Sequence, residues 1–166
     1  SSKTLKFGYN YHLSNIKTPY KVIHNGLNVL DWVRDNEIIR NKTSFVTVLG
    51  KGKIKIKGVD LIIEVASRFP NSIFYLAGIE NVKGYNIPKN IICKGRLTPE
   101  ELKVLFNQSQ FYLQLSNTEG FGVALCEAML CECIPLVSDV NFLPNIIGDS
   151  GFVLNKRNSD MLVDLI

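Results

Sequence analysis

The residues best suited to chemistry in this chain are two glutamates on either side of a Gly-Phe-Gly turn. Glu119 and Glu127 stand eight positions apart, and the turn at 120–122 leads into a helix-forming segment. The first N–H groups of a helix lack partners and its dipole is positive there, so a helix start attracts anions. Carboxylates repel a phosphate but accept hydrogen bonds from hydroxyl groups. The pattern therefore predicts a pocket for a sugar or ribose joined to a phosphate.

The composition is that of an ordinary globular domain. With 166 residues, 46% of them hydrophobic, the chain is long enough for one domain with a sizeable core. The net charge of +4 suits an anionic ligand, whereas nucleic-acid binders concentrate lysine and arginine more strongly, so we expect no nucleic-acid partner. No apolar run reaches the length of a membrane span and no signal peptide opens the chain, which predicts a cytoplasmic location.

The four cysteines do not form a recognisable metal or redox motif. Cys131 and Cys133 are separated by one residue rather than two, and no histidine lies near them. We therefore predict reduced, buried thiols, and no metal site, in a cytoplasmic protein.

Short apolar runs alternate with helical patterns from residue 45 onward. The runs typical of strands lie at 45–49, 72–77, 91–93, 111–115, 134–138 and 151–154. The helical patterns lie at 59–69, from Thr98-Pro99 onward, at 122–131 and at 159–166. This alternation predicts an α/β fold, with a Rossmann-like parallel sheet of about six strands and helices on both faces.

Segments rich in glycine or polar residues follow the predicted strands, at 50–58, 78–88, 94–97 and 116–122. The carboxyl ends of parallel strands meet at one edge of a sheet, and ligands bind in the crevice there. These segments are therefore expected to converge on one crevice.

The first 43 residues follow a different pattern. We predict a short strand and turn at 21–26 and a helix over 29–39, with Trp32 packing that helix against the domain. This part of the chain is interpreted as a lead-in along the edge of the domain.

Four motifs, in order along the chain, resemble those of one enzyme family. They are Val22-Ile23-His24-Asn25-Gly26-Leu27-Asn28, Lys57-Gly58-Val59-Asp60-Leu61-Ile62, Gly95-Arg96-Leu97 followed by Glu100-Glu101-Leu102, and Glu119 through Glu127 followed by Ile134-Pro135-Leu136-Val137. On these residues, positions 21 to 166 are similar to the C-terminal half of a retaining glycosyltransferase of family 4, which has the GT-B architecture. The resemblance implies a domain that binds a UDP- or GDP-sugar donor.

The resemblance also implies roles for particular residues. Glu127 holds the ribose hydroxyls, and Glu119 contacts the transferred sugar as a catalytic residue. Lys57 binds the diphosphate and stabilises its charge as it departs. A second cation is expected slightly earlier, with Lys51 preferred and Lys53 as the alternative. The other implied donor contacts are Gly120, Phe121, Gly122 and Val123 at the turn, and Gly95, Arg96 and Leu97 beside the base. Because the lysines and the helix start do the work of a metal ion, no metal or other cofactor is expected.

Members of this family have a further N-terminal domain that holds the acceptor. We therefore expect residues 1–20 to be a lead-in left from an interdomain linker and 21–166 to be the donor-binding domain, cut short in its last helix. The acceptor, a glycan or a lipid-linked sugar, would bind the missing domain, and the full-length enzyme could touch the cytoplasmic membrane face. The 166 residues alone are expected to bind donor without turnover.

The sequence departs from the family pattern at three places. Glu132 stands where the helix after the motif usually ends in glycine, so the turn there must differ or be strained. Asn141-Phe142 replaces a glycine pair, and Asn145 replaces an acid. Because this loop borders the donor sugar, the identity of that sugar stays open.

Other functions are compatible with parts of the pattern. A GT-B nucleotide-sugar epimerase and a non-catalytic nucleotide-sugar-binding module are the main alternatives. Glu119 and Glu127 could serve as the acid and base of a glycosidase, but such carboxylates would not flank a helix start built for anions. A dinucleotide-binding domain lacks support because Gly50-Lys51-Gly52 is only a fragment of the GxGxxG motif.

Overall fold

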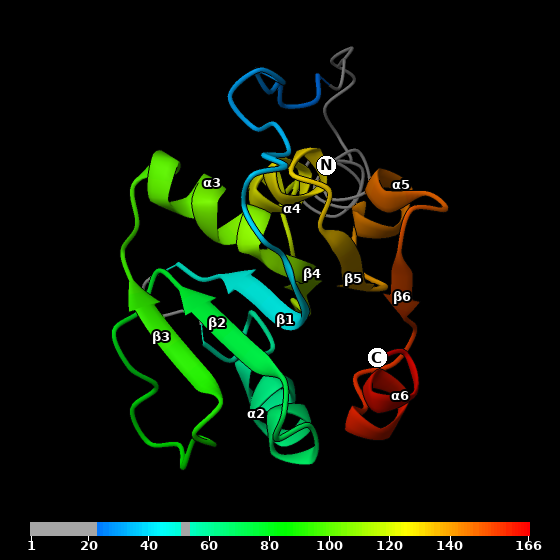
Figure 1. Ribbon diagram of the computed structural model, residues 1–166. Coiled ribbons are helices and arrows are strands. Elements are labelled where there is room, and N and C mark those ends of the chain that lie inside the picture. Colours follow the sequence, from blue (N-terminus) through cyan, green and yellow to red (C-terminus); the bar gives the residue numbers. More distant parts are fainter. Residues whose placement is uncertain (1–22, 51–53) are drawn as a thin grey trace, which may run out of the picture.

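The computed structural model describes residues 23–50 and 54–166 and shows a single six-stranded parallel sheet (Figure 1). The strand order is β3-β2-β1-β4-β5-β6. The strands are β1 (Asn41–Val48), β2 (Ile73–Ala77), β3 (Ile91–Gly95), β4 (Ser109–Gln114), β5 (Ile134–Ser138) and β6 (Phe152–Leu154). The predicted α/β class, strand number and parallel pairing are confirmed.

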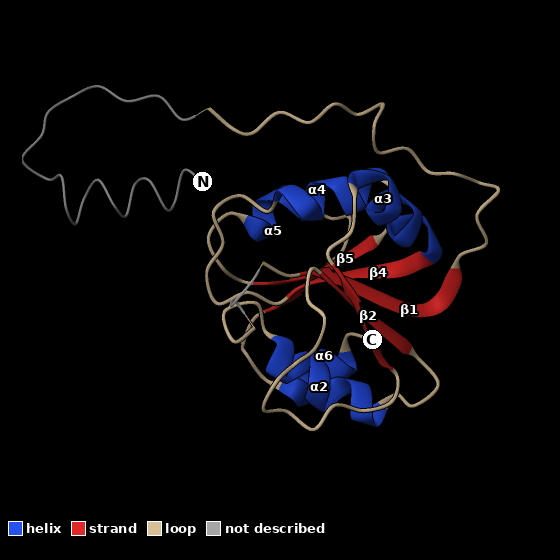
Figure 2. Ribbon diagram, turned by 90° about the vertical axis from the view of Figure 1, so that its left-hand side faces the viewer, coloured by secondary structure: helices blue, strands red, loops and turns tan. Residues whose placement is uncertain are grey.

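Helices cover both faces of the sheet (Figure 2). α2 (Val59–Arg68) and α6 (Ser159–Asp164) lie on one face, and α3 (Pro99–Gln108), α4 (Val123–Leu130) and α5 (Leu143–Ile147) lie on the other. Successive strand residues therefore enter different cores: Phe45 packs toward α2, and Val46 toward α3 and α4. This two-sided burial explains why the central strands are apolar without alternation.

The helix boundaries follow local signals in the sequence. Thr98 caps α3, and a complete capping box with Glu101 satisfies two backbone N–H groups. α5 was not predicted, because Leu143–Ile147 is only five residues long and its apolar run includes a proline. Short helices of this kind carry too little periodicity to be recognised.

The predicted lead-in helix over 29–39 is wrong, as is a strand over the described residues of 21–26. Residues 23–40 form turns instead, because short polar side chains bond the nearby backbone. The side chain of Asn28 accepts from the N–H of Leu30, and that of Asp35 accepts from the N–H of Glu37. Trp32 still packs on Phe106 of α3, with 5.7 Å between ring centroids, as expected of its contact with the domain.

The break after α4 explains how Glu132 replaces a glycine. Glu132 has φ 61°, in the left-handed region. The N–H of Glu132 donates to Met129 and that of Cys133 to Ala128, which is the hydrogen-bond pattern of a Schellman ending. The helix therefore ends in the same geometry that glycine would give. Because Glu132 has a Cβ, its left-handed backbone conformation costs free energy that glycine would not.

All four cysteines are free; Cys131 and Cys133 are buried as predicted, but Cys93 and Cys126 are only partly buried. Among the described residues, no helix is long and apolar enough to cross a membrane.

Candidate functional site

The candidate site lies where the strand order reverses between β1 and β4. The chain proceeds outward from β1 to β3 on one side and from β4 to β6 on the other, so the carboxyl ends of β1 and β4 leave a crevice between diverging loops. A cavity of about 280 Å³ occupies this position. Its lining residues are Val48, Leu49, Gly50, Lys57, Tyr112, Gln114, Glu119, Gly122, Val123 and Ala124.

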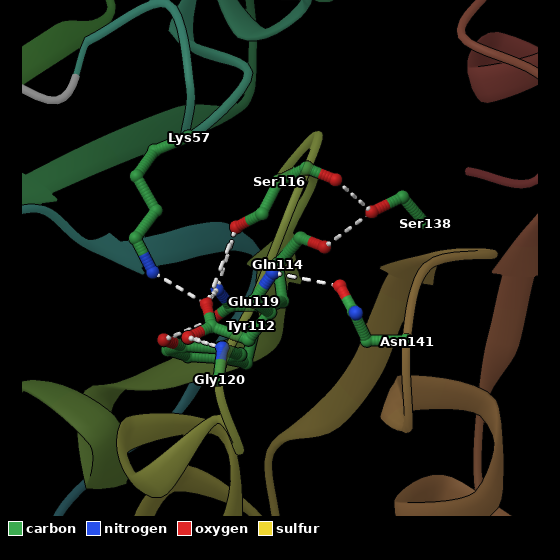
Figure 3. A network of polar contacts seen from close by, with 8 residues as sticks. All are labelled: Lys57, Tyr112, Gln114, Ser116, Glu119, Gly120, Ser138 and Asn141. Atoms are coloured by element: carbon green, nitrogen blue, oxygen red, sulfur yellow. Dashed lines mark hydrogen bonds and ion pairs between the residues drawn. The ribbon is translucent and has the colours of Figure 1, made fainter. Parts of the chain in front are cut away.

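An ion pair lies inside this cavity. The Nζ of Lys57 is 2.6 Å from Oε2 of Glu119, and only 17% and 15% of the two side chains are exposed (Figure 3). Lys57 directly precedes Gly58, the N-cap of α2, and Glu119 lies in the loop after β4. Partial burial strengthens such a pair, since less water screens the two charges.

Lys57 is held in place by a close approach of two backbones. Gly58, the N-cap of α2, has φ 76°, and a Cβ on it would lie 2.2 Å from the carbonyl oxygen of Leu115. The N–H of Asn117 also donates to the carbonyl of Ile56, at 2.8 Å. The loop before α2 and the loop after β4 are therefore locked together, which fixes both partners of the ion pair.

Buried polar side chains from β4 support Glu119 from behind (Figure 3). The amide nitrogen of Gln114 donates to Oε2 of Glu119 at 2.5 Å and to the hydroxyl of Ser116 at 2.8 Å. The hydroxyl of Tyr112 donates to Oε1 of Gln114 at 2.9 Å. Burial and the neighbouring Glu119 raise the pKa of Tyr112, so this hydroxyl stays protonated.

The backbone of Glu119 is also fixed. Its N–H donates to Oδ1 of Asn141 at 3.0 Å, and Oε1 of Glu119 accepts from the N–H of Gly120 at the same distance. Asn141 has φ 51°, a conformation that asparagine tolerates better than most residues. It therefore takes the backbone position of a glycine and adds a side-chain acceptor.

The start of α4 faces the same cavity. Gly122 is its N-cap, with φ 93° and no side-chain cap, and Gly122, Val123 and Ala124 line the cavity. Because no side chain of residues 23–50 or 54–166 caps this helix, its first N–H groups can bond a ligand. The anion site at the turn at 120–122 stays a prediction.

Glu127 lies one helical turn further along α4 and does not line this cavity. Four positions separate it from Val123, which does, so the two share a helix face. Burial raises the pKa of Glu127. Its charge, like that of Glu119, also acts on buried Tyr112, although burial itself is the main cause of the raised pKa there. Within the described residues, no hydrogen bond or ion pair engages the Glu127 side chain.

A second cavity, of about 780 Å³, continues from the first past Leu49 and Gly50. Arg96 lines it, together with Gly78, Ile79, Glu80, Asn81, Lys83 and Ile54. Gly95 has φ 65° and lies against the Glu80 carboxylate at its rim. Leu97 instead packs into the core beside α3 and α4.

The predicted site residues are thus mostly brought together. Lys57, Glu119, Gly122 and Val123 line one cavity, and Arg96 lines the adjoining one. Phe121 lines a separate apolar groove beside α4. Gly120 contacts Glu119 through its backbone. Lys51 and Lys53, like the lead-in at 1–20, lie outside the described residues.

Sequence reasoning gave Gln114 and Tyr112 no role beyond the predicted strand at 111–115, and it placed Asn141 only in a loop that borders the donor sugar. One signal for Gln114 was present: it is a polar residue inside an otherwise apolar strand, next to the motif. A buried polar side chain in such a place needs a partner. Nothing in the sequence indicated that Tyr112 bonds the amide of Gln114 or that Asn141 accepts from the backbone N–H of Glu119.

Across residues 23–50 and 54–166, no three or more histidine, cysteine, aspartate or glutamate residues are grouped so as to hold a metal ion. The charges of the described site are those of Lys57, Glu119 and Glu127, with Arg96, Glu80 and Lys83 at the second cavity.

Comparison with known proteins gives one family. The family described as "Glycosyl transferases group 1" matches residues 33–166. A GDP-mannose:cellobiosyl-diphosphopolyprenol alpha-mannosyltransferase of Xanthomonas campestris is 27% identical over 161 residues, which are 88% of this chain and 42% of that protein. An alpha-galactosylglucosyldiacylglycerol synthase of Streptococcus pneumoniae is 27% identical over 75% of this chain and 39% of its own length.

Solved structures share the fold. Sucrose-phosphate synthase from Thermosynechococcus elongatus superposes with a TM-score of 0.82, at 18% identity, over 99% of this chain and 46% of its own. The pneumococcal O-GlcNAc transferase GtfA, solved with UDP and GlcNAc, gives a TM-score of 0.70 at 21% identity, over 98% of this chain and 33% of its own. The chain thus spans less than half the length of these relatives.

Proposed function

This chain belongs to the glycosyl transferases of group 1, and on that premise we propose that its crevice binds a nucleotide-diphosphate sugar for transfer to an acceptor with retention. One observation supports this most directly: Lys57, Glu119 and the uncapped start of α4 line the same cavity at the reversal of strand order. That cavity offers a cation and free amides to phosphates, and a carboxylate to hydroxyls.

The diphosphate is the ligand part that suits Lys57 and the start of α4. Glu119 neutralises Lys57 at 2.6 Å. A diphosphate brought beside them would draw the ammonium toward itself, since two negative groups then compete for one cation. Lys57 and the N–H groups of α4 would stabilise the charge that develops as the nucleotide leaves.

The two glutamates suit the hydroxyl groups at either end of the donor. Glu119 is fixed through its backbone and both carboxylate oxygens, so it can orient the hydroxyls of the transferred sugar. No described residue bonds the Glu127 carboxylate on α4, and a carboxylate accepts two hydrogen bonds from a vicinal diol such as that of ribose. The second cavity beside Gly95 and Arg96 would hold the base.

The names of the relatives support the reaction class. Two contain "alpha-mannosyltransferase" or "alpha-galactosyl", and one of these specifies GDP-mannose as the donor. An α-linked product retains the configuration of a donor whose sugar is α-linked to the diphosphate. A GDP- or UDP-sugar and a glycan or lipid-linked acceptor are accordingly the substrates we propose for the full-length enzyme, acting at the cytoplasmic side of a membrane.

No metal ion is needed for this chemistry, since Lys57 and the α4 start supply the positive charge. We propose that the acceptor is held by a further domain, because the chain spans less than half the length of its relatives. The chain alone is therefore expected to bind donor and to transfer nothing, because closing a cleft over two substrates provides much of the rate.

The test is calorimetry of this chain with a panel of UDP-, GDP- and ADP-sugars. Binding of at least one is expected, with Glu127→Ala reducing its affinity about 10-fold or more through loss of two hydrogen bonds to a charged group. Glu64→Ala, an exposed position on α2, is the matched control. Absence of binding across the panel would refute the proposal. It would favour a module that has the fold of these enzymes but does not bind a donor. Conversion of a donor without an acceptor would instead indicate an epimerase.

A further inference from the structure

A network of buried polar side chains holds Glu119 through more hydrogen bonds than a carboxylate in a surface loop needs. Tyr112, Gln114 and Ser116 are 0%, 2% and 1% exposed, and their hydrogen bonds all lead to the same oxygen, Oε2 of Glu119. We infer that Gln114 is a positioning residue of this site, with Tyr112 setting the orientation of its amide. The inference rests on the donor-binding function proposed above.

The hydrogen bonds that link Tyr112, Gln114 and Glu119 each have only one possible direction. Glu119 can only accept when ionised, so the group facing it must be the NH₂ of Gln114. The oxygen of that amide then faces Tyr112, which donates its hydroxyl proton at 2.9 Å. If the Gln114 amide were flipped, its oxygen would face the carboxylate and two acceptors would meet at 2.5 Å. Tyr112 therefore holds the amide in the one orientation that supports Glu119.

Lys57 can leave Glu119, but Gln114 cannot. The lysine side chain is long and partly exposed, and a diphosphate would compete for it. Gln114 is fixed in the central strand β4, and its second amide hydrogen is taken by Ser116. When Lys57 moves to a phosphate, Gln114 and Ser116 remain as the donors that keep Glu119 aimed at the sugar.

The role of Gln114 can be tested by comparing the affinities for two ligands that differ only in the presence of the sugar. Replacing Gln114→Met keeps the length of the side chain but removes its amide. We expect the affinity for the nucleotide sugar to fall about 10-fold, the value of a lost hydrogen bond to a charged group. The affinity for the corresponding nucleotide diphosphate without sugar should change less than about 2-fold, since Glu119 contacts only the sugar. Tyr112→Phe should give a smaller loss with the same selectivity.

A double-mutant cycle separates positioning from damage to the fold. In a Glu119→Gln background, Gln114→Met should have little further effect on nucleotide-sugar affinity, because it acts through the carboxylate. Equal losses for the ligands with and without sugar, or additive effects in the cycle, would overturn the inference while leaving the proposed function intact. A wild-type chain that binds no nucleotide at all would refute both.

The second cavity supports an independent inference about the base. The Glu80 carboxylate lines this cavity of about 780 Å³ and lies so close to Gly95 that a Cβ there would be 2.6 Å from its Oε1. No hydrogen bond or ion pair occupies Glu80 within the described part of the chain. Arg96 and Lys83 line the same cavity. We propose that Glu80 selects guanine, so that the donor is a GDP-sugar.

Selection of the base would depend on matching its hydrogen-bond donors and acceptors to those of the cavity. Guanine presents two adjacent N–H donors, at N1 and at the exocyclic N2, and the two oxygens of a carboxylate can accept both. Uracil presents one imide N–H and adenine one amino group on the corresponding edge, so each makes fewer bonds to Glu80. The oxygen O6 of guanine is an acceptor, and the cations Arg96 and Lys83, which line the same cavity, only donate. A cavity lined by both a carboxylate and cations discriminates by the bonds that the wrong base leaves unmade.

The test compares GDP and UDP on three forms of the chain. Wild type should bind GDP about 10-fold more tightly than UDP, the value of one additional charged hydrogen bond. Glu80→Gln should lose most of that preference by weakening GDP binding alone, whereas Glu64→Gln on the exposed face of α2 should not change it. Tighter binding of UDP, or an equal effect of Glu80→Gln on both ligands, would overturn this inference without affecting the proposed function. Failure to bind either nucleotide would refute both.

Discussion

Lys57 and Glu119, 62 positions apart in the chain, form an ion pair of 2.6 Å that joins the start of α2 to the loop after β4. Both side chains are more than four-fifths buried, so each depends on the other for compensation of its charge. The pair therefore has a structural role, and Lys57 has the proposed binding role when a phosphate replaces Glu119 as its partner.

Lys57→Met should weaken nucleotide-diphosphate binding about 10-fold or more, because a charge-assisted contact to phosphate is lost. It should also lower the free energy of unfolding by about 2 kcal/mol, because Glu119 is left partly buried without its cation. Calorimetry and urea denaturation measure the two effects. Lys42→Met is the control, since Lys42 is exposed at the opposite end of β1. A double variant with Glu119→Gln that is less stable than Lys57→Met alone would contradict this account.

Glu127→Gln should make the domain more stable at pH 7 while weakening donor binding. Burial raises the pKa of Glu127 above its ordinary value of 4.5, so the folded state is penalised for the charge at neutral pH. As the pH falls through this raised pKa, the folded wild type takes up the proton and the penalty disappears. The stability difference between variant and wild type should therefore shrink in acid and vanish below about pH 4.5. Urea denaturation between pH 7 and pH 4 checks this, and a constant difference would disagree with it.

Glu132→Gly should stabilise the chain by about 1 kcal/mol, because glycine adopts the left-handed conformation at the end of α4 without strain. The contacts made by Arg40 to the carbonyl oxygens of Glu132 and Cys131 involve only backbone acceptors and should persist. The midpoint of urea denaturation measures this change in stability. A loss of stability would mean that the Glu132 side chain contributes more than its strained backbone costs.

Gly58→Ala should destabilise the domain by about 3 kcal/mol and abolish donor binding. A Cβ at this position would overlap the carbonyl of Leu115 and would also require a left-handed backbone. The resulting shift would separate Lys57 from Glu119. Gly26→Ala is the matched control, since a Cβ there meets nothing within 4 Å. Thermal unfolding distinguishes the two variants; a Gly58→Ala protein as stable as the control would show that the two loops are not locked together.

Chelation should leave donor binding unchanged. If the positive charge comes from Lys57 and the start of α4, calorimetric titrations in EDTA and in Mg²⁺ should give affinities within about 2-fold of each other, well below the 10-fold of a lost charged contact. A binding signal that appears only with a divalent cation would replace this hypothesis with metal-assisted binding.

Local patterns were sufficient to predict the parallel sheet and most of its helices. β5, α2 and the capped start of α3 fall where apolar runs, helical spacing and Thr98-Pro99 indicate them, because each signal acts within a few residues. The same local logic was wrong for 29–39. There, Asn28 and Asp35 compete for the backbone, and the side chain of Asn107 on α3 accepts from the N–H of Asp35 at 2.7 Å, a contact that no local pattern reveals.

For the site, the sequence by itself determined which chemical groups are present: the glycine turn, the two glutamates and the lysine before a helix. It also determined that they follow strand ends, which places them at one edge of a parallel sheet. Only the tertiary structure decided the partners. The pairing of Lys57 with Glu119, the support from Gln114 and the alignment of Asn141 with the Glu119 backbone join four separate segments of the chain. Hydrogen bonds and ion pairs act over a few ångströms in space, whereas sequence patterns describe only neighbours along the chain.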